Sequence, residues 1–135
     1  MGKAPRNYWS YLALTVMVAG FMAGCRSEAD RLTGKWQGTL DLTGIPQVKP
    51  GTTLRVVCDI GKNQDGTLGG TLDSPDQHAA GIPIDQVTIK DGAVHLYSNK
   101  VSASFDGQLS KDGSQIAGQW KQGGAALTTT LVKGQ

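Results

Sequence analysis

Aromatic and charged residues are scarce in this chain of 135 residues, and no run of basic residues is present. Aromatic residues make up 6% of the sequence, so a core must be built mostly from Leu, Ile and Val, which suit strands. The 13 basic residues nearly balance the 11 acidic ones. This balance excludes the electrostatic signature of nucleic-acid binding, and we expect no nucleic-acid partner.

Cysteine is equally rare, with two residues in the chain. Cys25 has a separate predicted use, described below, which leaves Cys58 without a partner for a disulfide bond. Cys58 alternates with Leu54, Val56 and Ile60 along one face of an expected strand. A free cysteine in such a position is usually a small buried hydrophobic residue, so we predict that Cys58 is buried and unreactive.

Histidine is too sparse to support a metal centre. The chain has two histidines, His78 and His95, and Asp76 is the nearest candidate third ligand. Their spacing matches no established ligand motif. We therefore predict neither a metal nor any other cofactor.

The N-terminus carries the most specific signal. Lys3 and Arg6 precede an apolar stretch, residues 12–23, that is too short to span a membrane comfortably. It ends in Met22-Ala23-Gly24-Cys25, which resembles the lipobox of bacterial lipoprotein signal peptides. The resemblance implies a signal-peptide helix at residues 1–24, cleavage before Cys25, and lipid on the Cys25 thiol. The alternatives are an uncleaved anchor helix and an ordinary secretory peptide.

The residues after the cleavage site predict a location in the cell. Residues 25–31 read as the lipidated Cys25 and a short polar tether without helical periodicity, and residues 32–135 as one domain. Arg26, rather than Asp, follows Cys25. By resemblance to the enterobacterial sorting rule, this predicts lipid anchoring at the periplasmic face of the outer membrane. The membrane is thus one expected partner.

From Leu32 onward, apolar and polar residues alternate with a period of two. Such alternation indicates half-buried strands. The apolar positions fall into eight short runs: Trp36 to Leu42, Leu54 to Ile60, Leu68 to Leu72, Val87 to Ile89, Val94 to Leu96, Phe105 to Leu109, Ile116 to Trp120, and Leu127 to Leu131.

Tight-turn sequences separate these runs. Asp65-Gly66, Asp91-Gly92, Asp112-Gly113 and Gly123-Gly124 favour hairpins, because these residues tolerate positive φ. We therefore predict an all-β, antiparallel up-and-down meander. Closure removes both edges of such a sheet, so a closed eight-stranded barrel is favoured over a two-sheet sandwich.

One pattern, apolar-x-Gly-x-apolar, occurs four times. Its glycines are Gly38, Gly70, Gly107 and Gly118. Each lies on the same face as its two apolar neighbours, which faces the interior. Such glycines either let the strands coil tightly or leave a cavity for a ligand, and both readings stay open.

Two resemblances support the barrel. Gly34-Lys35-Trp36 resembles the G-x-W of lipocalin-like barrels, in which the Trp closes one end. Most of residues 32–133 also resemble the small N-terminal domain of many bacterial α/β-hydrolases. The SPDQ…GIP stretch, residues 74–83, carries most of that resemblance, followed by Gln122-Gly123-Gly124.

The same resemblance implies an accessory role without hydrolase activity. The chain has no G-x-S-x-G elbow and no room for a hydrolase domain. A separate hydrolase of the cell envelope is therefore a possible partner. His78 also stands where a small residue is expected after SPDQ.

The candidate site residues come from these motifs. Ser74, Asp76 and His78 combine a hydroxyl, a carboxylate and an imidazole, but residues so close in sequence rarely align for catalysis, and turn chemistry explains them. We predict no catalytic residues. The predicted ligand-binding residues share a place at the barrel interior or its rim: Trp36, Ser74, Asp76, Gln77, His78, Trp120 and Gln122.

The sequence thus predicts a lipid-anchored, non-catalytic module of the cell envelope that binds a small molecule, with an apolar one among the candidates. The first alternative is a protein-interaction module that docks a separate envelope hydrolase. The second is a minimal hydrolase that uses Ser74 or Asp76.

Overall fold

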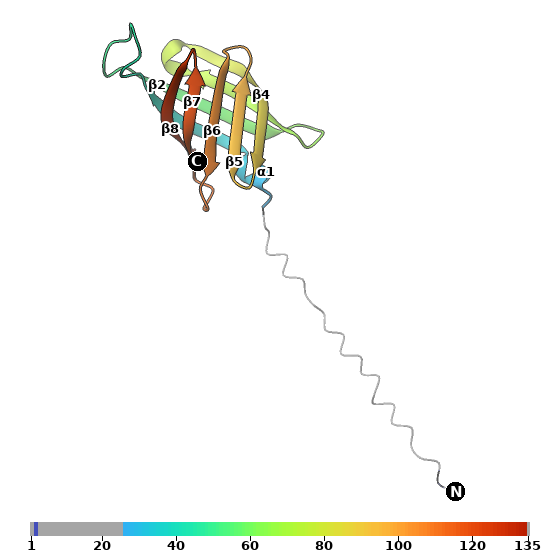
Figure 1. Cartoon of the computed structure of the whole chain (residues 1–135). Coiled ribbons are helices and arrows are strands. Elements are labelled where there is room, and N and C mark those ends of the chain that lie inside the picture. The colour runs from blue at the N-terminus through green and yellow to red at the C-terminus, as the bar shows by residue number, and fades with distance from the viewer. Residues whose placement is uncertain (1, 3–25, 135) are drawn as a thin grey trace.

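A computed structural model of the chain describes Gly2 and residues 26–134 (Figure 1). The signal peptide and its expected helix, and the lipidation site Cys25, lie outside the described residues. Among those that are described, no helix is long and apolar enough to cross a membrane.

Eight antiparallel strands form one closed sheet, in the order β1 to β8 around the barrel. The elements are α1 (Glu28–Leu32), β1 (Gly34–Asp41), β2 (Thr53–Lys62), β3 (Leu68–Ser74), the short 3₁₀ helix η2 (Pro75–Gln77), β4 (Ala79–Lys90), β5 (Ala93–Ser98), β6 (Ala103–Leu109), β7 (Gln115–Gln122) and β8 (Ala125–Lys133). This confirms the all-β, up-and-down barrel, compatible with a lipocalin-like fold, and excludes the two-sheet sandwich. All eight strands lie within residues 34–133, so this segment carries the complete barrel.

The predicted alternation sets the inward residues. The buried positions include both expected tryptophans, Trp36 at 0% and Trp120 at 6% exposure. Cys58 is buried as predicted, and burial raises the pKa of its thiol to about 12, so it stays protonated near neutral pH.

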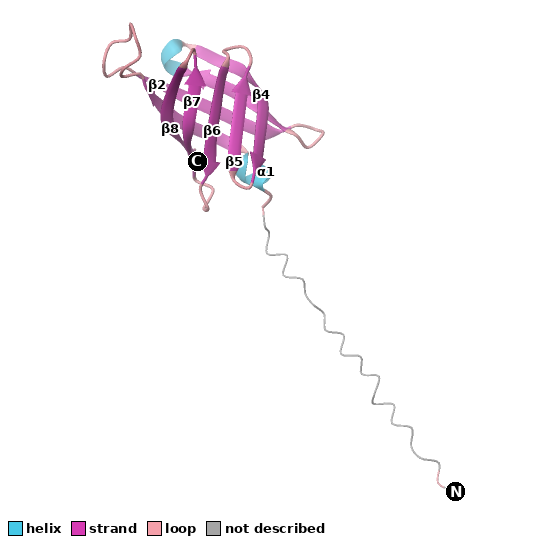
Figure 2. Ribbon diagram, in the orientation of Figure 1, coloured by secondary structure: helices cyan, strands magenta, loops and turns pink. Residues whose placement is uncertain are grey.

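The strand order gives the barrel two distinct ends. Successive strands alternate in direction, so every second connection lies at the same end. One end, called the closed end here, carries α1 and the β2–β3, β4–β5 and β6–β7 turns. The other end, called the mouth, carries the β1–β2 loop (residues 42–52), η2 and the β5–β6 and β7–β8 turns. Figure 2 shows η2 and α1 at opposite ends.

Helix α1 differs from the polar tether expected for this stretch. Ser27 caps it, because the Asp30 backbone N–H donates to Ser27 Oγ over 3.1 Å. Leu32 at its end is fully buried, and its carbonyl accepts a hydrogen bond of 2.8 Å from Trp36 Nε1. Five residues are too few to show an apolar stripe in the sequence. Leu32 and Trp36 together therefore close this end of the barrel.

Polar side chains of α1 fasten it to two turns at the closed end. The Glu28 carboxylate accepts hydrogen bonds from the Asp91 and Gly92 N–H groups over 3.2 and 2.7 Å. Arg31 Nη2 donates to the carbonyls of Ser110 and Lys111 over 3.2 and 2.5 Å. The N-terminal segment of the domain is thus held rigidly against the barrel.

The inward glycines mark close approaches between strands. A Cβ at Gly118 would lie 2.1 Å from the Asp106 carbonyl oxygen, and one at Gly70 would lie 2.1 Å from that of Asp59. No side chain fits so close to a neighbouring backbone. The geometry therefore favours tight strand coiling over an interior cavity as the reason for these glycines.

We predict that Gly118→Ala destabilises the barrel by about 1–3 kcal/mol, because the neighbouring backbone must move to admit the methyl group. Chemical denaturation measures this loss. Gly61→Ala is the matched control, since a Cβ there meets nothing within 4 Å. Equal denaturation midpoints for the two variants would contradict this role of Gly118.

Candidate functional site

The structure brings six of the seven predicted ligand-binding residues to the mouth. Trp120 and Gln122 lie at the end of β7, and residues 74–78 connect β3 to β4 at the same end. Trp36 lies near the start of β1 and packs at the closed end. Its inward direction was predictable, but it takes no part in a site at the mouth.

The mouth contains an apolar pocket with a volume of about 150 Å³. Aliphatic side chains and one indole ring make most of its wall. The lining residues are Leu40, Leu42, Ile45, Leu54, Trp120, Gln122, Ala125 and Leu127. The pocket therefore lies between the β1–β2 loop and the β7–β8 hairpin.

Hydrogen bonds fix the one amide side chain in this pocket. Trp120 Nε1 donates to Gln122 Oε1 over 3.1 Å, and Gln122 Nε2 donates to the Val101 carbonyl oxygen over 3.1 Å. This chain of bonds ties the indole of β7 to the β5–β6 turn. It places the only strongly polar side chain of the pocket at its solvent-exposed rim.

Below the pocket, the barrel interior is filled by side chains. The cavity that remains there has a volume of about 10 Å³, and inward residues such as Phe105, Leu96 and Cys58 surround it. A space of that size holds at most about one water molecule. This cavity thus has no room for an organic ligand, whereas the pocket at the mouth does.

Two polar side chains of the SPDQH turn, residues 74–78, bond to each other within the turn. Ser74 is buried, and its Oγ donates to Gln77 Oε1 over 3.0 Å. His78 ends η2 in the left-handed conformation with φ of 53° and is exposed. Asp76 contacts neither of these side chains but reaches across to β2.

Asp76 forms the best-defined ion pair of the mouth. Its carboxylate accepts a hydrogen bond from Arg55 Nη2 and another from the Arg55 backbone N–H, each over 2.8 Å. The hydrogen bonds from Arg55 lower the pKa of Asp76 below its usual value. A carboxylate held ionised in this way is a poor general acid or base near neutral pH, so its evident role is to fasten η2 to β2.

No cluster of three or more His, Cys, Asp or Glu side chains that could hold a metal ion exists among the described residues. His95 lies on the outer wall, where its Nδ1 is 2.6 Å from Asp106 Oδ1 of the paired strand. His78 and Asp76 are in the SPDQH turn at the mouth. The three candidate metal ligands, Asp76, His78 and His95, therefore lie in two separate places, the mouth and the outer wall.

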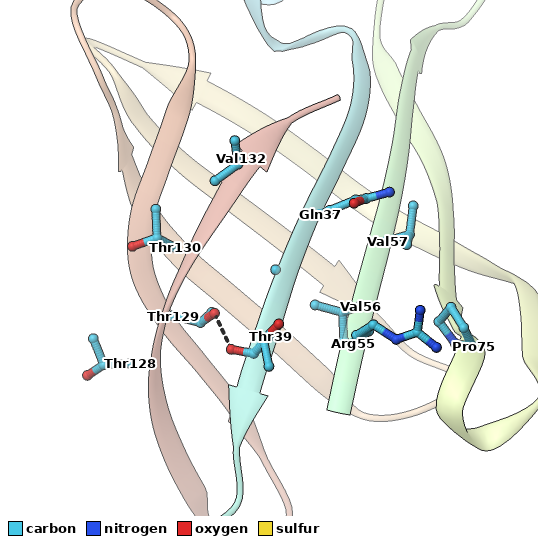
Figure 3. A pocket seen from close by; sticks show the side chains of 11 residues that line it. Gln37, Thr39, Arg55, Val56, Val57, Pro75, Thr128, Thr129, Thr130 and Val132 are labelled. Atoms are coloured by element: carbon cyan, nitrogen blue, oxygen red, sulfur yellow. Dashed lines mark hydrogen bonds between the residues drawn. The ribbon is translucent and has the colours of Figure 1, made fainter. Parts of the chain in front are cut away.

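A second hollow lies on the outer wall, over β8, β1 and β2, with a volume of about 690 Å³. Figure 3 shows Arg55 and Pro75 on one side of it and Thr128 to Thr130 on the other. Thr129 Oγ1 donates to the Thr39 carbonyl over 2.8 Å across the hollow. Nearby Val132 is 47% exposed, which is unusual for a large aliphatic residue in the described part of the chain.

Sequence reasoning missed the aliphatic part of the mouth pocket. Leu42 belongs to the first alternating run but was not assigned to a site, and Ile45 lies in the β1–β2 loop, where no alternating pattern gives a direction for a side chain. The available signal was composition: a loop of turn residues carries Ile45 and Val48, and both are half-buried.

No family model, curated protein or solved structure matches this chain. The resemblance of residues 74–83 to a hydrolase-attached domain therefore stays a prediction, and the site must be interpreted from its own geometry.

We predict that Asp76→Asn lowers stability at pH 6 and has little effect at pH 2. The pKa of Asp76 is lowered in the folded protein, so its stabilisation is present above the unfolded pKa of about 4. It is lost as the pH falls through the lower folded value. Urea denaturation at several pH values measures the difference from wild type.

Asp59→Asn is the control for this titration, because Asp59 is exposed on the same strand as Arg55. It should change the denaturation midpoint little at either pH. A constant difference between Asp76→Asn and wild type from pH 2 to pH 6 would contradict the ion-pair interpretation.

Proposed function

We propose that the chain is a non-catalytic binding module, anchored to a membrane through lipid on Cys25, that accepts a small apolar group at its mouth. The apolar pocket of about 150 Å³ carries this proposal. An enclosed apolar cavity of about that volume in another protein binds benzene or xenon, and this pocket, which is open to solvent on one side, has room for a group of similar size. The expected occupant is therefore a ring or alkyl group of about six carbons.

The pocket also suggests the kind of molecule that bears this group. Gln122 sits at the rim and is the one amide among aliphatic neighbours. An amphiphile would place its apolar end against Leu54 and Leu127 and its polar end near Gln122. Pockets for small molecules commonly combine an apolar wall with a few placed polar groups.

In this proposal, the lipid on Cys25 is next to the closed end of the barrel, opposite the mouth. Cys25 precedes Ser27, the cap of α1, by two residues, a span of at most about 7 Å. Since α1 is fastened to the closed end, a lipid on Cys25 would hold that end next to the bilayer. The mouth would then lie roughly 20 Å farther out, given strands of about eight residues with the usual tilt.

The location that goes with this arrangement is the cell envelope, with the periplasmic face of the outer membrane as the specific proposal. The lipobox-like Met22-Ala23-Gly24-Cys25 and the following Arg26 support it. A mouth that points away from the membrane would receive its ligand from the aqueous side.

A protein-interaction role is the second candidate, favoured by the hollow on the outer wall. The hollow is about 690 Å³ in volume and borders Pro75 of the SPDQH turn, and Val132 beside it is exposed. A single exposed aliphatic residue is common on protein surfaces, so this candidate rests on the hollow and on its position beside the SPDQH turn. A separate envelope hydrolase would be the expected partner.

The hydrolase alternative has the least support. The hydroxyl of Ser74 donates to Gln77, and the carboxylate of Asp76 is paired with Arg55. Nucleophilic catalysis needs a base in line with the hydroxyl, and Gln77 is not one.

We predict that Ala125→Phe abolishes the binding of 1-hexanol, because the ring would fill the pocket from the β7–β8 hairpin. Titration calorimetry measures the binding. Ala126→Phe is the matched control, since Ala126 is the exposed neighbour that lies outside the pocket. Binding that survives Ala125→Phe would place the ligand elsewhere, and equal loss in both variants would indicate damage to the fold.

We also predict that Cys25→Ser prevents lipidation. Metabolic labelling with palmitate should mark the wild-type chain and leave the variant unlabelled, and the variant should leave the membrane fraction. Equal membrane association of both chains would contradict a lipid anchor at Cys25.

A further inference from the structure

Trp120 lies between the two cavities of the barrel. Its side chain lines both the mouth pocket of about 150 Å³ and the interior cavity of about 10 Å³. In the sheet, Trp120 faces Phe105 on one side and Leu127 on the other. The indole therefore forms a wall that separates the pocket from the interior.

Three of the side chains that line the interior cavity are small. They are Cys58, Ser98 and Ala103, which are almost completely buried, and they lie beside larger side chains such as Leu96 and Phe105. The space next to the indole is thus bordered in part by small groups. A smaller residue at position 120 would join the cavity to the pocket and deepen it along the barrel axis.

The position of the indole is set by hydrogen bonds as well as by packing. Gln122 Oε1 accepts from Trp120 Nε1, and Gln122 is itself held by the Val101 carbonyl. Gln122 is exposed, so it holds the ring without contributing to the core. It is a positioning residue that acts through Trp120.

We propose that Trp120 is the floor of the mouth pocket and sets the maximum length of the apolar chain that the site accepts, with Gln122 holding the floor in place. This inference rests on the proposed function and makes it more specific. The ligand class is an uncharged amphiphile with an unbranched apolar end of about six carbons, inserted end-on with its polar group at the rim.

A ligand series of increasing length reveals such a floor. Each carbon that enters an apolar pocket improves affinity by about fourfold, and carbons that stay outside add little. For the wild-type protein, the affinity of 1-alkanols should therefore rise from 1-butanol to 1-hexanol and then level off.

Titration calorimetry with 1-butanol to 1-nonanol tests this on residues 26–135, which contain the complete closed barrel. With Trp120→Leu, 1-octanol should bind about 16-fold more tightly than 1-hexanol, whereas the two should bind almost equally to wild type. Trp120→Phe should extend by less the alkanol length at which affinity levels off. It provides the test if circular dichroism shows that Trp120→Leu does not fold.

Gln122→Ala should also extend the limit, because the ring is then free to tilt, whereas Gln119→Ala should not. Gln119 is an exposed glutamine on the same strand and serves as the matched control. An unchanged limit in Gln122→Ala would remove Gln122 from the proposal.

The remaining outcomes distinguish the floor from the site itself. An unchanged limit in folded Trp120→Leu or Trp120→Phe, with normal binding of 1-hexanol, would overturn the role of Trp120 and leave the binding site intact. No measurable binding of any alkanol to wild type would overturn both the floor and the proposed apolar site.

Discussion

Closure of the sheet is the constraint on which the rest of the molecule depends. Eight strands leave an interior just wide enough to be filled by inward side chains or to hold one small ligand, and in this barrel the inward side chains fill most of it. The strands must also coil tightly, and Gly118 and Gly70 permit this by letting neighbouring backbones approach closer than any side chain allows. The filled interior of this barrel and its inward glycines therefore have one origin. A pocket that reaches into the barrel can exist only where the filling stops, at an end.

The two ends then differ because their closing residues differ. At the closed end, Leu32 and Trp36 lie completely buried, and polar side chains of α1 fasten the helix to the turns. At the mouth, Trp120 borders an open pocket that Leu54, Leu127 and Ile45 of the β1–β2 loop also line. The two tryptophans, both correctly predicted to face inward, thus have different roles: Trp36 closes one end, and Trp120 borders the pocket at the other.

The fold was largely predictable because short-range patterns determine it. The alternation of apolar and polar residues predicted which strand residues face inward, and dipeptides such as Asp91-Gly92 predicted the turns. Helix α1 was not predicted, since Leu32 is its only buried residue and a stripe needs at least two turns. Of the residues that line the mouth pocket, Trp120 and Gln122 were among the predicted ligand-binding residues, and that role stays a prediction. Ile45 was not among them, because the conformation of a loop depends on contacts between distant segments that no local pattern records.

The most direct test of a filled barrel with an apolar pocket at its mouth is xenon binding, followed by methyl NMR under xenon pressure. Xenon enters dry apolar cavities of about 150 Å³ and is excluded from the space of about 10 Å³ in the interior. The largest shifts should occur at the methyl groups of Leu42, Leu54 and Leu127. Shifts centred instead on Leu96, Val94 and Ile84 would show a hollow interior and contradict the assignment of the site to the mouth.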